Sequence, residues 1–156
     1  MREFPGAVLP KDIADRPSWD AYFMAIVRAV ATRATCSRRA IGAVLVKNKL
    51  ILATGYNGAP AGLRHCDHTA GGDLLNDHCV RSTHAEQNAI VQAARHGISI
   101  EGATLYCSNN PCQTCAKLLI NAGVNRIVYE AAYPDDIAFG LLREACVVTE
   151  RLQSEP

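Results

Sequence analysis

The residues of this chain that could do chemistry lie in two short motifs, HAE at 84–86 and PCQTC at 111–115. A Cys-x-x-Cys pair that opens a helix holds both sulfur atoms at the helix N-terminus, where the dipole and free N–H groups favour thiolates. Two thiolates and one neutral imidazole fill three of zinc's four tetrahedral positions and leave the fourth for water. The motifs therefore predict a catalytic zinc site with His84, Cys112 and Cys115 as ligands.

Glu86 is the candidate proton carrier of this site. It stands two residues after His84, so at a helix start it can face zinc-activated water without binding the metal. One alternative is a closed structural zinc site, in which a further cysteine is the fourth ligand and Glu86 is a solvated carboxylate. The other is a set of buried thiols without metal, which the exposed position of a Cys-x-x-Cys helix start disfavours.

The elements that must position these residues follow from hydrophobic periodicity and turn signals. We expect helices over residues 17–33, 84–96, 115–123 and 136–146, and strands over 40–46, 50–56, 103–108, 126–130 and 147–150. The first two strands form an antiparallel hairpin, and the later ones are parallel because helical crossovers separate them. The predicted class is α/β: a three-layer α-β-α fold whose mixed five-stranded sheet has helices on both faces.

This order of elements explains how the two motifs can meet. The strand 103–108 lies between the helices that carry the motifs, so both helix N-termini should emerge at the carboxyl edge of the sheet. Open α/β sheets bind their ligands at that edge.

Length and composition limit the classes of protein to consider. The 156 residues fit one domain, which we expect to span 1–156 with a core at about 18–150, and the 49% hydrophobic content argues against disorder. A net charge of +1 disfavours a nucleic-acid partner. The first thirty residues show neither a signal peptide nor a membrane span, so we expect a cytoplasmic protein without a membrane partner.

Several segments beyond the two motifs resemble the deoxycytidylate (dCMP) deaminases of the zinc-dependent cytidine/deoxycytidylate deaminase family. The H-x-E…P-C-x-x-C pattern is the signature of zinc deaminases. The resemblance covers about residues 36–150, and GYNGAPAG at 55–62 with HAEQNAI at 84–90 distinguishes this family from cytidine, tRNA adenosine and guanine deaminases. The other similar segments are 36–44, 102–106, 111–117 and 120–123. A cytidine-deaminase-like fold is implied.

The resemblance also implies a reaction and a substrate. Zinc-activated water attacks C4 of the cytosine ring, Glu86 protonates N3 and later the leaving amine, and dCMP becomes dUMP and ammonia, which supplies dUMP for thymidylate synthesis. The Ala85 N–H would bind the base carbonyl, Asn57 the sugar hydroxyl, and Tyr133 would lie over the site. Asn57 could instead be a turn residue, and Tyr133 a half-buried loop residue.

A nucleotide substrate also needs a cationic group for its phosphate. The arginines near the expected loops are Arg33, which we place among the substrate-binding residues, and Arg38, Arg39, Arg64 and Arg81, and the sequence does not choose among them.

A second, structural zinc site is predicted in the long loop 57–80, which needs a ligand to order it. Its candidate ligands are Cys36, Cys66 and Cys79 with either His68 or His78, and the alternative is free thiols. Some family members resemble this chain in carrying such a site. The remaining cysteines, Cys107 and Cys146, are expected in the core.

Regulation and assembly follow from the resemblance alone. Many dCMP deaminases are hexamers that dCTP activates and dTTP inhibits, and Mg²⁺ would enter only with the regulatory nucleotide. Alternatives are a deaminase of another cytosine nucleotide or of a polynucleotide base, and a noncatalytic zinc-binding protein. A polynucleotide enzyme would need a basic or aromatic track, whereas the chain has only nine Tyr, Phe and Trp residues.

Overall fold

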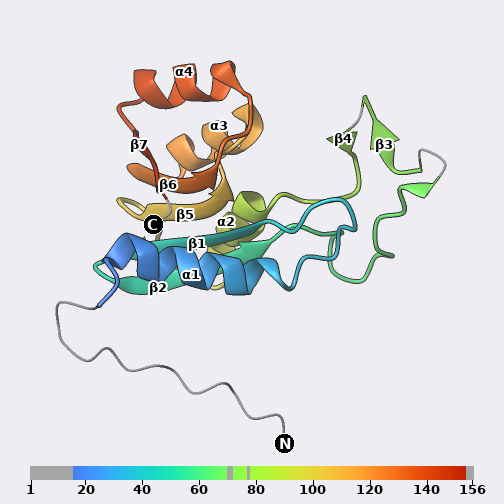
Figure 1. Ribbon diagram of the computed structural model, residues 1–156, viewed down its shortest axis with the longest axis horizontal. Helices are drawn as coiled ribbons and strands as arrows, with labels where there is room; N and C mark the ends of the chain where they lie inside the picture. Colours follow the sequence, from blue (N-terminus) through green and yellow to red (C-terminus); the bar gives the residue numbers. More distant parts are fainter. Residues whose placement is uncertain (1–15, 70–71, 77, 154–156) are drawn as a thin grey trace, which may run out of the picture.

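The computed structural model describes residues 16–69, 72–76 and 78–153 (Figure 1). The ends of the predicted domain, 1–15 and 154–156, lie outside these residues. The helices are α1 (Trp19–Ala31), α2 (Ala85–Arg95), α3 (Gln113–Asn121) and α4 (Asp136–Glu144). The strands are β1 (Gly42–Lys47), β2 (Leu50–Tyr56), β3 (Leu74–Leu75), β4 (His78–Cys79), β5 (Thr104–Asn109), β6 (Arg126–Ala131) and β7 (Val148–Arg151).

Five strands form one mixed sheet in the order β2-β1-β5-β6-β7. The β1–β2 hairpin is antiparallel and turns at Asn48 and Lys49, whose φ angles of 52° and 65° suit a tight hairpin. β1 is also antiparallel to β5, whereas β5, β6 and β7 are parallel. This arrangement confirms the predicted α/β class and its mixed five-stranded sheet.

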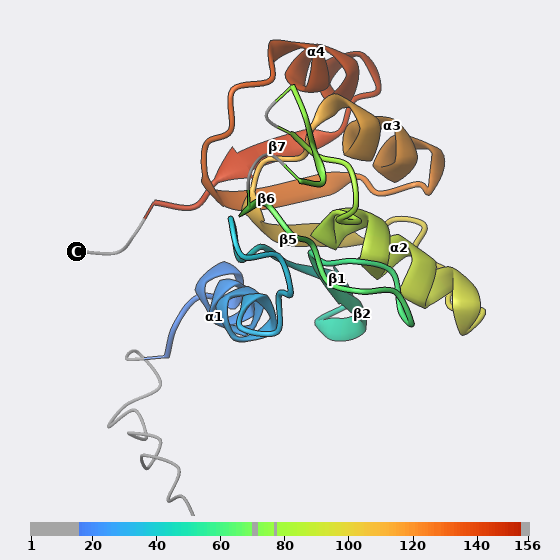
Figure 2. The ribbon, with the colours of Figure 1, turned by 90° about the vertical axis from the view of Figure 1, so that its right-hand side faces the viewer.

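Helices cover both faces of the sheet and bury two hydrophobic clusters. On one face, Phe23, Met24 and Val27 of α1 pack with Val44 and Tyr106 of the sheet. On the other, the small side chains of α2, together with buried residues of α3 and α4, form the larger cluster. Figure 2 shows α1 on one side of the sheet and α2 and α3 on the other.

The close approach of α2 to the sheet depends on Gly55 in β2. A Cβ atom at this position would lie 2.2 Å from the Ala85 carbonyl oxygen and 2.4 Å from the Ala89 nitrogen, and neither backbone atom can rotate away. We therefore expect Gly55→Ala to lower the free energy of unfolding by about 2–3 kcal/mol in urea denaturation. Gly140→Ala in α4 is the control, because its Cβ would have nothing within 4 Å. An equal effect of both substitutions would contradict the packing argument.

A polar network ties α1 to three strands of the sheet. Arg126 of β6 donates to Asp20 of α1 (Nη2 to Oδ2, 2.7 Å), and the Tyr106 hydroxyl donates to Asp20 Oδ1 (2.7 Å). Arg126 also pairs with Glu150 of β7. The hydrogen bond from Arg126 is the main cause that lowers the pKa of Asp20 below its ordinary value.

Because the pKa of Asp20 is lowered, we expect its contribution to the free energy of unfolding to depend on pH. A carboxyl group whose pKa is lower in the folded state stabilises the fold above its unfolded pKa, about 4, and loses that contribution as the pH falls through the folded pKa. We expect Asp20→Asn to lower the free energy of unfolding by about 1 kcal/mol at pH 7, and the difference from the parent protein to shrink towards pH 3. Urea denaturation across this range measures it. A difference that stays constant with pH would show that the carboxylate charge contributes nothing.

Two local differences from the sequence-based expectation have physical causes. The loop 57–80 contains a short antiparallel hairpin, β3–β4, which extends away from the sheet (Figure 1). Helix α4 ends at Glu144 rather than at 146, because Cys146 adopts a φ of 57° that an α-helix does not allow. The same residue is exposed, which corrects its expected place in the core, whereas Cys107 is buried as expected. Within the described part of the chain, no helix is both long and apolar enough to cross a bilayer.

Candidate metal centre and pocket

His84, Cys112 and Cys115 come together where two helices begin. His84 is the N-cap of α2 and Cys112 is the N-cap of α3, which starts just after β5. The Nδ1 atom of His84 lies 3.5 Å from Cys112 Sγ and 3.4 Å from Cys115 Sγ. The three ligand atoms lie within 4.8 Å of one another.

The donor set of this group suits zinc in an open site. Two thiolates and one imidazole are soft and borderline ligands of the kinds that zinc prefers. Within the described residues, no fourth histidine, cysteine or carboxylate joins the group. A position for water is therefore left, which disfavours a closed structural site.

Glu86 lies beside this group in the first turn of α2. Its side chain is only 5% exposed and lines the same cavity as His84 and Cys112. Burial raises the pKa of Glu86 to about 7, whereas hydrogen bonding with Cys115 lowers the pKa of Cys112 to about 4. The Glu86 carboxyl group and the Cys112 thiol, which ionises readily to a thiolate that can bind a metal, thus line the same cavity.

The cavity has a volume of about 280 Å³, and most of the predicted substrate-binding residues line it. Asn57, Ala85 and Tyr133 line it, together with Arg38 and Arg39. Arg33, by contrast, does not line this cavity in the described structure. This corrects its expected placement: Arg33 follows the end of α1, and the chain turns into the pocket wall only at Cys36.

Asn57 holds the pocket wall together through both polar atoms of its side chain. Its Oδ1 accepts from the Ile41 N–H (2.8 Å), and its Nδ2 donates to the Arg39 carbonyl (2.8 Å). The side chain is 7% exposed. Only the second N–H of its amide and a spare lone pair of its oxygen remain for a sugar hydroxyl.

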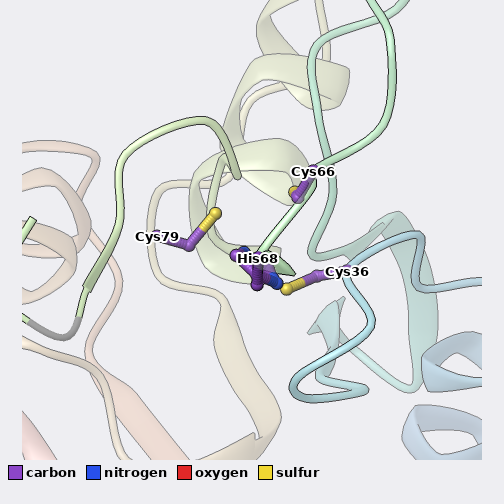
Figure 3. A group of neighbouring side chains, drawn as sticks. All are labelled: Cys36, Cys66, His68 and Cys79. Atoms are coloured by element: carbon purple, nitrogen blue, oxygen red, sulfur yellow. The ribbon is translucent and has the colours of Figure 1, made fainter. Parts of the chain in front are cut away.

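A second group of candidate ligands lies next to the pocket. The side chains of Cys36, Cys66, His68 and Cys79 converge from separate segments of the chain (Figure 3), and their ligand atoms lie within 4.8 Å of one another. We call this group the cysteine cluster. Cys36 and Cys79 also line the cavity, so the cluster forms part of the pocket wall.

The cysteine cluster has the donor atoms of a zinc site, and it contains one of the two histidines that the sequence offered as alternatives. Among the described residues, the Nε2 atom of His68 is buried and has no hydrogen-bond partner, whereas its Nδ1 lies 3.2 Å from the Ser37 hydroxyl. A metal would satisfy the first atom while Ser37 orients the ring. His78 does not join the cluster, which corrects its candidacy as a ligand; it lines the cavity instead. Neighbouring residues of a strand point to opposite faces, so His78 and Cys79 in β4 cannot both face the cluster.

Two carboxylates outside the predicted site residues, Asp73 and Asp135, order the segments next to the pocket. Asp73 binds both Arg64 and Arg81 within the loop. Asp135 accepts from the Gln113 N–H at the start of α3 (Oδ2, 2.8 Å) and from the Ala138 N–H in α4 (Oδ1, 2.9 Å). An aspartate before an apolar helical run is an N-cap signal, so the cap on α4 was predictable, whereas the contact with α3 was not.

Comparison with known proteins gives consistent matches. A family model for the cytidine and deoxycytidylate deaminase zinc-binding region matches residues 17–131. The chain is 39% identical over 140 residues to ComE operon protein 2 of Bacillus subtilis (strain 168), which covers 89% of this chain and 74% of that protein. It is 37% identical over 142 residues to the deoxycytidylate deaminase of Saccharomyces cerevisiae, covering 87% of this chain but only 45% of the yeast protein.

A solved structure of similar length also matches. The crystal structure of dCMP deaminase from the cyanophage S-TIM5, in complex with dCMP and dUMP, aligns with a TM-score of 0.78 and 32% sequence identity. The alignment covers 88% of this chain and 98% of the phage chain.

Proposed function

This chain belongs to the cytidine and deoxycytidylate deaminase family, and we propose that it is a zinc-dependent hydrolase that converts dCMP to dUMP and ammonia. The observation that carries the proposal is that His84 and Cys112, which are grouped with Cys115, line the same cavity as Glu86. The choice of dCMP is supported by the phage relative, whose structure holds dCMP and dUMP.

The residues of the cavity have distinct parts in the proposed reaction. His84, Cys112 and Cys115 would hold zinc, which when bound acts as a Lewis acid and makes water nucleophilic near neutral pH. Glu86 takes the first proton of the water and delivers it to N3 as charge builds there during attack on C4, then takes the second proton from the hydroxyl formed at C4 and gives it to the amine, which leaves as ammonia. One buried carboxylate can serve all these transfers because it faces a single small space.

Other side chains would orient the base. The N–H of Ala85 is at the first position of α2, where helix N–H groups have no partner within the helix, and it can donate to the base carbonyl. Tyr133 lies on the cavity wall, and its backbone is fixed by Asn110, whose Nδ2 donates to the Tyr133 carbonyl (2.8 Å). Water exclusion by this aromatic ring would strengthen the polar contacts inside.

The proposal also assigns the cysteine cluster to a second, structural zinc. Three thiolates and one imidazole make a closed tetrahedral set, and the partnerless Nε2 of His68 supports a metal at its centre. This metal would join the segment after α1 to the loop 57–80.

Further parts of the proposal rest on the family resemblance. They are a single deaminase domain over the chain, a hexameric assembly, activation by dCTP and inhibition by dTTP with Mg²⁺ bound to the nucleotide, dUMP supply for thymidylate synthesis, and a cytoplasmic location. The near-neutral net charge of +1 supports a small-molecule substrate over a polynucleotide.

The test is ammonia release from the purified chain with dCMP, deoxycytidine, CMP and dCTP in parallel, each with and without added dTTP, alongside zinc content per chain. We expect turnover of dCMP above the others and two zinc ions per chain. Bound zinc without turnover of any of the four would refute the proposal and direct the search to polynucleotide substrates.

A further inference from the structure

Three amide or carboxyl side chains are buried among residues 16–69, 72–76 and 78–153, and all three line the cavity. They are Asn57, Glu86 and Asn110. Burying a polar group costs free energy unless hydrogen bonds compensate it, so each of these positions calls for an explanation. The proposed reaction uses Asn57 and Glu86. Asn110, which is only 3% exposed, has no part in it so far.

The side chain of Asn110 binds both polar backbone atoms of Tyr133. Its Nδ2 donates to the Tyr133 carbonyl (2.8 Å), and its Oδ1 accepts from the Tyr133 N–H. The backbone pairing of β5 with β6 ends at Asn109 and Ala131. Because a side-chain amide has a donor and an acceptor in one plane, as a peptide group does, Asn110 continues this pairing beyond the end of β6.

The hydrogen bonds from Asn110 matter because the segment around Tyr133 has little packing of its own. Ala132 and Pro134, the residues on either side of Tyr133, are both exposed. Asn110, by contrast, is followed by the buried Pro111, and a residue before proline is restricted to extended backbone conformations. The rigid partner of this contact is therefore Asn110, and Tyr133 takes its position from it.

The same contact links the two sides of the cavity. Asn110 stands two residues before Cys112, the N-cap of α3 and a member of the candidate metal site. Asp135 makes a second tie between the same two segments, since its Oδ2 accepts from the Gln113 N–H (2.8 Å). The backbone of Tyr133 is thus held at a fixed place relative to the turn that carries Cys112.

We propose that Asn110 is a positioning residue that holds the Tyr133 ring over the cytosine base and acts on deamination through Tyr133 alone. The inference rests on the proposed deaminase function, which places the base between Glu86 and Tyr133. Without the two hydrogen bonds the ring would sample positions that admit water or miss the base. A misplacement of about 1 Å can cost up to about 100-fold in rate.

The experiment is a double-mutant cycle on the zinc-loaded full chain, assayed with dCMP well below the melting temperature of each variant. We expect Asn110→Ala to lower kcat/KM at least about tenfold, because both hydrogen bonds to Tyr133 are lost. In a Tyr133→Ala background the same substitution should change kcat/KM by less than about twofold, since no ring remains to be positioned. A general effect on the fold would give the same factor in both backgrounds.

The control is Asn121→Ala, which changes an exposed asparagine at the end of α3 and should leave kcat/KM unaffected. All variants should keep the zinc content of the parent chain. Equal losses in the two backgrounds would overturn the proposal, as would unchanged kcat/KM in Asn110→Ala. Loss of zinc in Asn110→Ala would overturn it too, because Asn110 would then act through Cys112.

Hydrogen exchange at the Tyr133 amide, measured by NMR, tests the positioning without any turnover. In the parent chain we expect exchange at least about 100-fold slower than in an unprotected peptide. Asn110→Ala should remove this protection but leave that of Val128, which lies within β6 between two paired strands. Fast exchange at Tyr133 in the parent chain would overturn the inference even if Asn110→Ala failed to fold.

The two kinds of measurement separate this inference from the proposed function. If the parent chain does not deaminate dCMP, the deaminase function fails, and the exchange rates at Tyr133 alone decide whether Asn110 fixes the cavity wall. If the parent chain deaminates dCMP and the Tyr133 amide exchanges equally fast with and without Asn110, the positioning role fails and the function stands.

Discussion

Glu86→Gln should abolish deamination while the protein keeps its zinc and its fold. Glutamine has nearly the same shape as glutamate, so the buried position at the start of α2 stays filled, but an amide cannot accept and return a proton. Loss of general acid–base catalysis costs up to about 10⁴-fold, and since this side chain would serve several transfers, we expect kcat to fall at least about 10³-fold. Ammonia release at saturating dCMP measures the effect.

The control for this experiment is Glu144→Gln, which changes an exposed glutamate at the end of α4. Zinc content and the melting temperature should match the parent protein in both variants. Retained deamination in Glu86→Gln would remove Glu86 from the proton-transfer role. Loss of zinc along with activity would instead assign it to the support of the metal site.

Cys66→Ser should remove one zinc ion per chain and lower thermal stability, because Cys66 is one of the four cluster ligands and lies in the loop that the cluster joins to the segment after α1. Binding of structural zinc is coupled to folding, so losing it costs several kcal/mol. A loss of about 4 kcal/mol corresponds to roughly 10 °C in melting temperature for a domain of this size. Metal analysis and a thermal melt give the two readouts.

Cys146→Ser is the matched control, since Cys146 is exposed and belongs to neither group of ligands. It should retain the parent zinc content and melting temperature. Unchanged zinc and unchanged melting in Cys66→Ser would show that the cluster consists of free thiols. Loss of both metals would show that the two sites do not fold independently.

Local signals were sufficient to predict the elements of the sheet and the grouping of His84, Cys112 and Cys115. The strands at 42–47, 50–56, 104–109, 126–131 and 148–151 carry apolar or β-branched runs bounded by turns, and each falls within two residues of its expected place. His84, Cys112 and Cys115 flank a single strand, β5, so the topology alone brings them to one edge. The sequence therefore constrained this group before any contact was known.

The loop 57–80 could not be predicted in the same way, because its path depends on contacts between distant residues. Nothing local distinguishes His68 from His78, yet only His68 reaches the other cluster residues. Likewise, Arg39 and Arg64 look alike in the sequence, yet Arg39 lines the cavity whereas Arg64 pairs with Asp73 in the loop. β3 and β4 have two residues each, too few for any periodicity to be visible. Contacts between residues that are distant in the sequence determine which of these side chains join the cluster or form an ion pair.

The carboxylate of Asp135 has a dynamic consequence, because it caps the starts of α3 and α4 together. Local unfolding that carries Asp135 away from α4 also releases the Gln113 N–H, which adjoins Cys112 of the candidate metal site. We therefore expect the first turns of the two helices to open together, so that fraying of α4 reaches the edge of the sheet where His84 and Cys112 lie. We expect the stability of α4 to limit the opening of α3 in this way.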